Sequence, residues 1–145
     1  MKLRFALVAG LITLGLLGGC ASVPMASAEA DASAKEFTSL SDKAKLYNYR
    51  NESLGSAVKL PVLIDNAWVG DTAAKTYIVR TLDPGVHTVL SKAEQDSVLQ
   101  INAQSGQSYF VWQEIKMGLF APRTLLHAVD EAVGRKGVTE CKLIK

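Results

Sequence analysis

From residue 44 onward the chain alternates between short apolar runs and turn residues, and this rhythm is its strongest constraint on the fold. The runs are rich in β-branched and aromatic side chains, which favours strands over helices. Turn signals recur roughly every 8–12 residues, as in small β-sandwiches. The runs cover residues 46–50, 58–65, 67–70, 75–82, 86–91, 97–104 and 108–117. We therefore expect an all-β fold, a small β-sandwich of about seven strands over residues 44–145.

Local patterns define the faces and turns of these strands. Residues 97–104 alternate most clearly, so that Leu99 and Ile101 are expected on one face and their neighbours on the other. Asp65-Asn66 is predicted to form a two-residue hairpin turn, because both residue types tolerate a left-handed backbone. In Asp83-Pro84-Gly85, Pro84 presets φ and Gly85 supplies the positive φ of a type II turn.

The C-terminal stretch LLHAVDEAVGRKGVTECKLIK departs from the strand pattern. It begins as a strand that can extend through Val129. Asp130 is then placed to cap a short C-terminal helix. Gly134 and Gly137 weaken this helix by up to about 1 kcal/mol each, so its formation depends on packing.

The first 19 residues form a segment of a different kind. Lys2 and Arg4 carry positive charge, and residues 5–19 then run for 15 residues without any charge. A membrane-spanning helix needs about 20 apolar residues, so this run is short for one. A basic start, a short apolar stretch and small residues at its end are typical of an export signal. We predict that residues 1–19 are a signal peptide.

Charge excludes one class of function. Of the 16 Lys and Arg residues, two precede Cys20, which leaves 14 against 14 Asp and Glu in the predicted mature chain. A nucleic-acid-binding protein normally has a clustered basic surface, and no run of the sequence suggests one. We expect no nucleic-acid partner.

The end of the signal, Leu17-Gly18-Gly19-Cys20, resembles the lipobox of bacterial lipoproteins. The resemblance implies that the Cys20 thiol receives a diacylglyceryl group, that cleavage separates Gly19 from Cys20, and that the new amino terminus is acylated with a fatty acid such as palmitate. Two or three acyl chains hold a protein to a bilayer without a polypeptide span. The alternative is an ordinary export signal with an unrelated cysteine.

The residues after Cys20 carry two further expectations. Ala21-Ser22, with no aspartate, resembles the outer-membrane sorting pattern of Gram-negative lipoproteins, so we expect a lipid-anchored protein of the outer membrane that faces the periplasm. Residues 20–43 are rich in Ala and Ser, with few bulky apolar residues and no sustained period. They are predicted to form a flexible tether. A short helix over residues 34–40 is the alternative.

Longer motifs suggest a family. VLIDNAWVGDT (62–72) and YIVRTLDPGVHTV (77–89) resemble PEGA-type surface β-domains, with Asn66 where a glycine is usual. Together with KLYNYR (45–50) and SGQSYFVW (105–112), the arrangement over residues 44–143 resembles a bacterial lipoprotein family of uncharacterised function, domain of unknown function 2846. The resemblance implies a Greek-key sandwich of prealbumin or carboxypeptidase-regulatory type. It brings no catalytic residues.

Catalytic and metal-binding motifs are absent from the sequence. We interpret His87 as a side chain that bonds the preceding turn, and His127 as a core or edge histidine. Cys141 either pairs with Cys20 in a disulfide or is a small buried apolar residue. We expect no enzymatic activity, no cofactor and no metal.

Apolar residues in predicted loops are the candidates for binding. Trp68 lies near the Asp65-Asn66 turn, and Met117, Leu119 and Phe120 lie in a connection that contains Gly and Pro. These side chains either plug the open end of the sandwich or form an exposed interaction site. We expect a non-catalytic interaction or structural module of the cell envelope, with an envelope protein or a glycan as partner. A periplasmic ligand-binding domain for glycan, peptidoglycan or lipid is the alternative.

Overall fold

The computed structural model describes residues 20–145. The predicted signal peptide, including Gly19 at its cleavage site, lies outside the described residues. No helix of the described part is long and apolar enough to cross a membrane. The elements are α1 (Ala28–Ala34), β1 (Ala44–Arg50), β2 (Leu60–Ile64), β3 (Ala67–Thr72), β4 (Thr76–Leu82), β5 (Gly85–Ser91), β6 (Ser97–Ala103), β7 (Ser108–Lys116), β8 (Arg123–Val129), α2 (Glu131–Thr139) and β9 (Lys142–Leu143).

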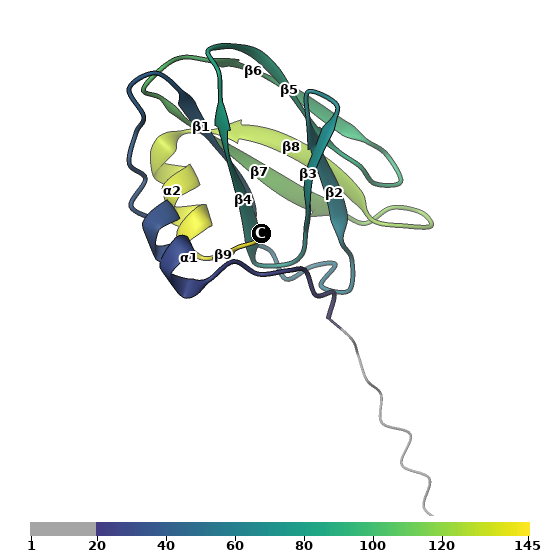
Figure 1. Ribbon diagram of the computed structural model, residues 1–145. Coiled ribbons are helices and arrows are strands. Elements are labelled where there is room, and N and C mark those ends of the chain that lie inside the picture. The colour runs from purple at the N-terminus through teal and green to yellow at the C-terminus, as the bar shows by residue number, and fades with distance from the viewer. Residues whose placement is uncertain (1–19) are drawn as a thin grey trace, which may run out of the picture.

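The strands form two sheets, with the orders β8-β7-β1-β4-β9 and β3-β2-β5-β6 (Figure 1). Neighbouring strands are antiparallel except in the pairs β1–β7 and β4–β9, which are parallel. The seven predicted runs correspond to β1 to β7, and β8 ends at Val129 as predicted. The fold was predicted as all-β, and it is mostly β, with two sheets and two helices. The two-residue β9 was not predicted, because so short a strand has no readable period.

The core lies between the two sheets. It is built from inward-facing side chains of both, including Leu46 and Ile78 from one sheet and Val62 and Val89 from the other. The predicted alternation in β6 is confirmed, since its residues are buried and exposed in turn. Burial of alternate side chains on a pleated strand fixes the register of this sheet against the core.

A hydrogen-bonded polar network crosses this core. Gln113 on β7 is 0% exposed, and its Oε1 accepts from Asn48 Nδ2 at 3.2 Å and Thr72 Oγ1 at 2.7 Å. Its Nε2 donates to Ser91 Oγ at 2.6 Å, and Ser91 Oγ donates to Thr124 Oγ1 at 3.1 Å. The network joins β1, β3, β5, β7 and β8. A buried amide without these partners costs several kcal/mol, roughly, so the network favours this one pairing of the sheets.

Both helices pack on the outer face of the five-stranded sheet (Figure 1). A second apolar cluster lies beneath them, with Tyr47, Tyr77 and Phe110 from the sheet. Asp130 caps α2 as predicted, its Oδ1 accepting from Val133 N at 2.9 Å. The cluster supplies the packing on which the predicted C-terminal helix depends.

The two glycines of α2 permit a close approach to the sheet. A Cβ atom on Gly134 would lie 2.2 Å from the Phe110 side chain, and one on Gly137 would lie 2.1 Å from the Tyr49 ring. Real Cβ atoms do not approach other atoms so closely, so either helix or sheet would have to shift. Here glycine is favoured by helix–sheet packing, which outweighs its low helix propensity.

We therefore expect Gly137→Ala to destabilise the protein, although alanine is the better helix former. Overpacking of this kind costs about 1–3 kcal/mol, against less than about 1 kcal/mol gained in propensity. Chemical denaturation of the variant measures the difference. Ala132→Gly, at an exposed position of the same helix, serves as a control that loses propensity without a clash. A stabilised Gly137→Ala protein would contradict the close packing of α2.

The segment predicted as a flexible tether is instead packed on the domain. Val23 is buried, Met25 forms a bridge with Ile144, and Ser27 caps α1 through a bond from Ala30 N at 3.2 Å. The helix lies at Ala28–Ala34, so the predicted alternative at residues 34–40 is also wrong in position. The prediction failed because the segment is held mainly by backbone hydrogen bonds and small side chains. Such contacts produce no periodic pattern of apolar residues in the sequence.

The predicted hairpin turn at Asp65-Asn66 is confirmed, with positive φ angles of 51° and 66°. Asp65 also joins this turn to β5. Its Oδ1 accepts from Thr88 N at 2.9 Å, and its Oδ2 lies 2.6 Å from His87 Nδ1. His87 Nε2 lies 2.8 Å from Asp83 O, so the interpretation of His87 as a turn-bonding side chain is confirmed.

This contact predicts a pH dependence. The hydrogen bond to Asp65 raises the pKa of His87, and the bond from His87 lowers the pKa of Asp65. The stability contributed by His87 is therefore fully present below its unfolded pKa of about 6.5 and is lost as pH rises through the higher folded value. We expect the stability difference between wild type and His87→Gln to shrink from about pH 6 to about pH 9. Urea denaturation at both pH values measures it; a constant difference would contradict the assignment.

Candidate functional site

Cys20, the predicted attachment residue, is exposed and lies next to the body of the domain. The next residue is already bonded, since Ala21 N donates to Ser56 O at 2.8 Å. Two more backbone bonds follow, from Lys145 N to Pro24 O at 2.9 Å and from Ala26 N to Leu143 O at 3.0 Å. No free linker separates Cys20 from the domain. We refer to Cys20, residues 21–25 and residues 51–59 together as the Cys20 end.

The loop at residues 51–59, which receives Ala21, is held by a buried arginine. Arg50 is 0% exposed, and its Nη1 donates to Val58 O at 2.8 Å. Its Nη2 donates to Leu54 O at 3.1 Å and Gly55 O at 2.5 Å. Burial lowers the pKa of Arg50. Arg50 thus has three carbonyl groups as partners in place of a carboxylate. These bonds fix the loop at residues 51–59, to which Ala21 is bonded.

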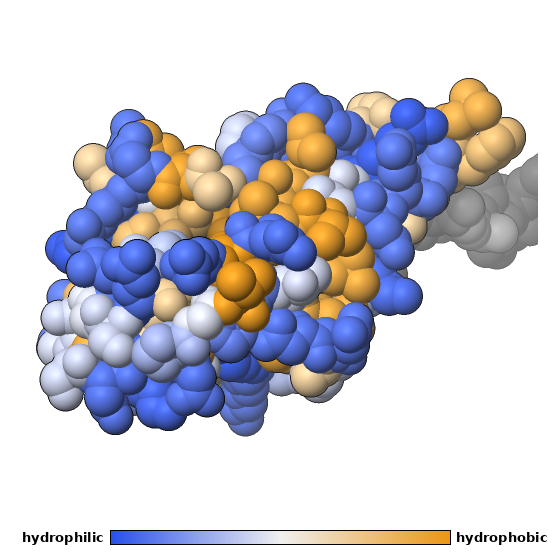
Figure 2. All heavy atoms as spheres, turned by 90° about the horizontal axis from the view of Figure 1, so that it is seen from above, coloured by the Kyte–Doolittle hydropathy of each residue, from blue (hydrophilic) through white to orange (hydrophobic). Residues whose placement is uncertain are grey.

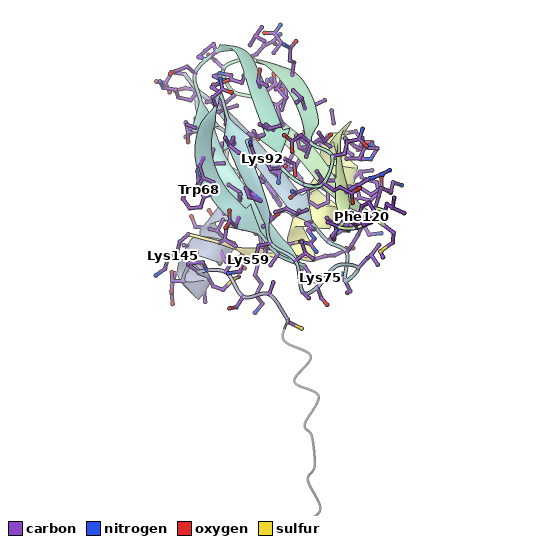
Figure 3. The ribbon with its side chains drawn as sticks, turned by 90° about the vertical axis from the view of Figure 1, so that its right-hand side faces the viewer. Lys59, Trp68, Lys75, Lys92, Phe120 and Lys145 are labelled. Atoms are coloured by element: carbon purple, nitrogen blue, oxygen red, sulfur yellow. The ribbon has the colours of Figure 1, made fainter. Side chains whose placement is uncertain are left out.

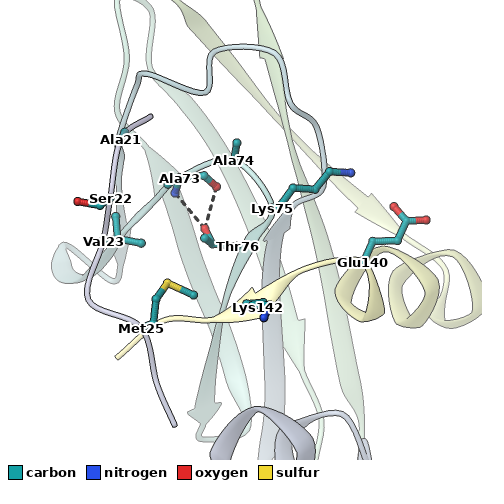
Figure 4. A pocket seen from close by; sticks show the side chains of 10 residues that line it. All are labelled: Ala21, Ser22, Val23, Met25, Ala73, Ala74, Lys75, Thr76, Glu140 and Lys142. Carbon is teal, nitrogen blue, oxygen red and sulfur yellow. Dashed lines mark hydrogen bonds between the residues drawn. The ribbon is translucent and has the colours of Figure 1, made fainter. Parts of the chain in front are cut away.

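Four exposed lysines surround the Cys20 end. Lys75 and Lys142 line a hollow of about 340 Å³ together with Ala21 (Figure 4). Lys59 and Lys145 line a second hollow of about 310 Å³ with Val23 and Pro24. Figure 3 shows Lys59, Lys75 and Lys145 at the end of the molecule where the described chain begins. This cluster could not be predicted from the sequence, because its members come from three distant segments.

Carboxylates also lie near these lysines, and they are bonded to other groups: Glu52 Oε2, within residues 51–59, accepts from Ile115 N at 2.8 Å. Glu140 Oε2 accepts from Asn51 Nδ2 at 2.8 Å, and Asp71 Oδ1 accepts from Trp68 Nε1 at 2.8 Å. Among the described residues, none of the four lysines forms an ion pair. The cluster therefore presents excess positive charge, although the formal charges of residues 20–145 balance.

The predicted interaction residues of the 117–120 connection lie in the loop that joins β7 to β8. We refer to residues 117–122 as the tip loop. Met117, Leu119 and Phe120 are 75%, 76% and 91% exposed. The alternative in which these side chains plug the space between the sheets is wrong. Phe120 instead extends from the side of the domain (Figure 3).

A carboxylate outside the loop holds its backbone. Glu94 Oε2 accepts from Ala121 N at 2.7 Å and from Phe120 N at 3.2 Å, and Oε1 lies 3.4 Å from Arg123 Nη2. The bond from Ala121 N is the main cause of a lowered pKa of Glu94. The loop is thus ordered while its apolar side chains face solvent. Sequence reasoning missed Glu94, since nothing local connects it to a loop more than 20 residues away.

Some apolar side chains outside the tip loop are exposed as well. Met117 and Leu125 line one hollow of about 270 Å³. Val98 on β6 and Val86 on β5 are also exposed. Seen from above, apolar side chains gather in the middle of the molecule and polar ones surround them (Figure 2).

Trp68 is 65% exposed and lies on β3, apart from Phe120 (Figure 3). It is paired with Leu63 in the sheet, and Leu63 is paired with Leu90 on β5. The structure therefore does not bring the two groups of predicted interaction residues together. Trp68 stands at one edge of the four-stranded sheet, and the tip loop belongs to the other sheet.

The remaining candidates for chemistry have structural surroundings. His127 on the edge strand β8 lies 2.8 Å from Glu114 Oε2 and stacks on Trp112, which confirms its interpretation as an edge histidine. Cys141 is a free, buried thiol, and burial raises its pKa to about 12. It is protonated at neutral pH and does not pair with Cys20. Within residues 20–145, no three His, Cys, Asp or Glu side chains come together as metal ligands would.

Comparison with known proteins gives a family but no activity. Residues 40–125 match the family model described as "Protein of unknown function (DUF2846)". A protein of Haemophilus influenzae, described as "Uncharacterized protein", is 35% identical over 130 residues, which is 88% of this chain and 77% of that protein. No solved structure matches.

Proposed function

The chain belongs to the DUF2846 family, whose function is unknown, and we propose that it is a non-catalytic lipoprotein of the cell envelope. In this proposal, residues 1–19 are removed as a signal peptide and Cys20 carries the lipid. The domain, a Greek-key sandwich of prealbumin type with PEGA-like turns, then presents the tip loop to an envelope protein. Ala21-Ser22 favours the outer membrane and its periplasmic side.

One observation carries the interaction part of this proposal: an ordered loop exposes three large apolar side chains. Water-exposed apolar side chains are common singly, but a contiguous set on a fixed backbone is typical of a partner site. Phe120 contributes little to packing within the domain, since its side chain is 91% exposed. Because Glu94 already orders the backbone, a partner would not have to bear the entropy cost of ordering it.

The position of the loop supports a partner in the same membrane. The described part of the chain begins at the bottom of the domain in Figure 1, whereas the β7–β8 connection extends to the side. If the domain is attached at Cys20, the tip loop with Phe120 would extend sideways, along the membrane plane. A neighbouring envelope protein fits this orientation better than a glycan. A glycan would bind the exposed aromatic ring of Trp68, and no contact of the described residues favours that alternative.

Phe120→Asp tests the proposal by crosslinking in intact cells. We expect wild type to give a discrete adduct with one envelope protein, and Phe120→Asp to reduce it at least about tenfold by placing a charge in an apolar interface. Stability should change by no more than about 0.5 kcal/mol, because the side chain is on the surface.

Val86→Asp is the matched control, since Val86 is 66% exposed but lies on β5. It should crosslink like wild type. An undiminished adduct from folded Phe120→Asp would contradict the role of the tip loop. Loss of the adduct from both variants would show that the partner does not distinguish the loop from the sheet surface.

A further inference from the structure

We propose that the four lysines of the Cys20 end form the membrane-facing surface of the protein and bind the phosphate groups of anionic phospholipids. The inference rests on the lipid attachment at Cys20 proposed above. It adds a specific orientation and a lipid preference, neither of which follows from attachment alone.

The first step is the length of chain between lipid and domain. Ala21 N is bonded to Ser56 O at 2.8 Å, so Cys20 is the single residue between the acyl chains and an ordered backbone. One residue spans less than about 4 Å. The surface around Ser56 must then lie against the headgroup layer, and the domain cannot rotate away as it could on a flexible tether.

The second step is the stability of that attachment. Residues 21–26 are bonded at both ends, by Ser56 on one side and by the C-terminal strand region through Pro24 and Leu143 on the other. Val23 is buried between these bonds. Arg50 in turn fixes the loop that carries Ser56. The orientation at the membrane is therefore set by the fold.

The third step is charge. The lysines are exposed, form no ion pair within the described residues, and line the two hollows that border residues 21–25. The two hollows are lined by these four lysines and by two carboxylates, Asp71 and Glu140, so positive charge is in excess there. All four line hollows that also border residues 21–25, directly after Cys20. Charges closer together than the Debye length of about 8 Å are only partly screened. Each lysine near an anionic surface strengthens binding roughly fivefold.

The fourth step is the choice of partner. The lysines surround the chain start, and a partner protein would have to share this space with the acyl chains of Cys20. A headgroup layer occupies the space by necessity. Ammonium groups are compact donors that bind phosphate as point charges without a fixed partner geometry, which suits a fluid lipid surface.

Lysine labelling of the mature protein tests the inference. The protein is purified from membranes, reconstituted into phosphatidylcholine vesicles with or without phosphatidylglycerol, and treated with an amine-specific reagent. Labelling rates are read for each lysine by mass spectrometry. We expect Lys59, Lys75, Lys142 and Lys145 to be labelled at least about fivefold more slowly in the phosphatidylglycerol vesicles. Exposed Lys92, which lies farther from the chain start, should not change (Figure 3).

A pair of variants sharpens the test. Lys75→Gln with Lys142→Gln should reduce the protection of Lys59 and Lys145, whereas Lys92→Gln should leave it unchanged. If labelling of the four lysines and of Lys92 were slowed by the same factor, the orientation would be overturned. If the four lysines were protected equally in vesicles with and without phosphatidylglycerol, the preference for anionic lipid would be overturned. Flotation separates these results from failure of the anchor: a protein that does not float with vesicles has no lipid, which overturns the proposed attachment and this inference together.

Discussion

Replacing Arg50 by methionine is expected to lower the free energy of unfolding by about 3 kcal/mol, because three backbone carbonyls of the loop at residues 51–59 lose their charged donor. Methionine fills a similar space and removes the cost of burying a charge. That cost is seen in the wild-type protein, where burial lowers the pKa of Arg50. That relief is smaller than the loss. The three carbonyls at Val58, Leu54 and Gly55 remain in place, and only that of Gly55 keeps another donor, Val58 N at 2.9 Å.

Arg80→Met is the matched control for this prediction. Arg80 also donates to two backbone carbonyls, those of Val79 and Val69, but it is partly exposed, so water can replace it. We expect a loss below about 1 kcal/mol. Urea denaturation measures both variants, and hydrogen exchange should show faster exchange at residues 51–59 in Arg50→Met alone. Equal losses in the two variants would contradict the role given to Arg50.

Replacing Cys20 by serine is expected to have the largest effect in cells. A hydroxyl does not replace the thiol as acceptor of the diacylglyceryl group, so the precursor should keep residues 1–19 and carry no lipid. Metabolic labelling with palmitate and the apparent mass on a gel read the two effects separately. Labelling should fall to background, and the precursor should be longer than the mature protein by the signal peptide.

Cys141→Ser is the control for this substitution. Cys141 is buried, and its Sγ lies 3.5 Å from Arg50 O, so the change tests a cysteine that has a purely structural position. This variant should be processed and labelled like wild type. Normal processing of Cys20→Ser would contradict the attachment site.

The strands were predictable because their determinants are local. The alternation of β6, the left-handed residues of the Asp65-Asn66 turn and the Asp130 cap each depend on neighbours in sequence. The exposure of Phe120 was one of two open alternatives. Sequence could not decide between them, because Glu94, which orders the tip loop, lies 26 residues away.

The Cys20 end could not be predicted, for a physical reason. An arginine in a strand ordinarily reaches water, and only the fold reveals that Arg50 is buried under three carbonyls. The packing of α1 relies on bonds such as Leu143 N to Asp31 Oδ1 at 2.9 Å, which join distant segments. A local signal for α1 did exist: Ser27 at the N-cap, followed by an Ala-rich run with Glu29 in its first turn.

The packing of residues 21–26 changes what the segment after Cys20 does to the position of the domain. Twenty flexible residues would place the domain at a variable distance from the membrane and leave its orientation free. With the proposed lipid on Cys20, the packed segment would give one orientation, in which the lysines lie toward the attachment point and the tip loop extends sideways. Envelope location, partner binding and lipid contact, as proposed, would then all depend on Cys20.

Mass spectrometry of the mature protein, isolated from membranes, tests that dependence most directly. We expect an N-terminal peptide that begins at Cys20, carries a diacylglyceryl group on Sγ, and lacks all of residues 1–19. A mature protein that retains residues before Cys20, or that has an unmodified thiol at Cys20, would contradict it.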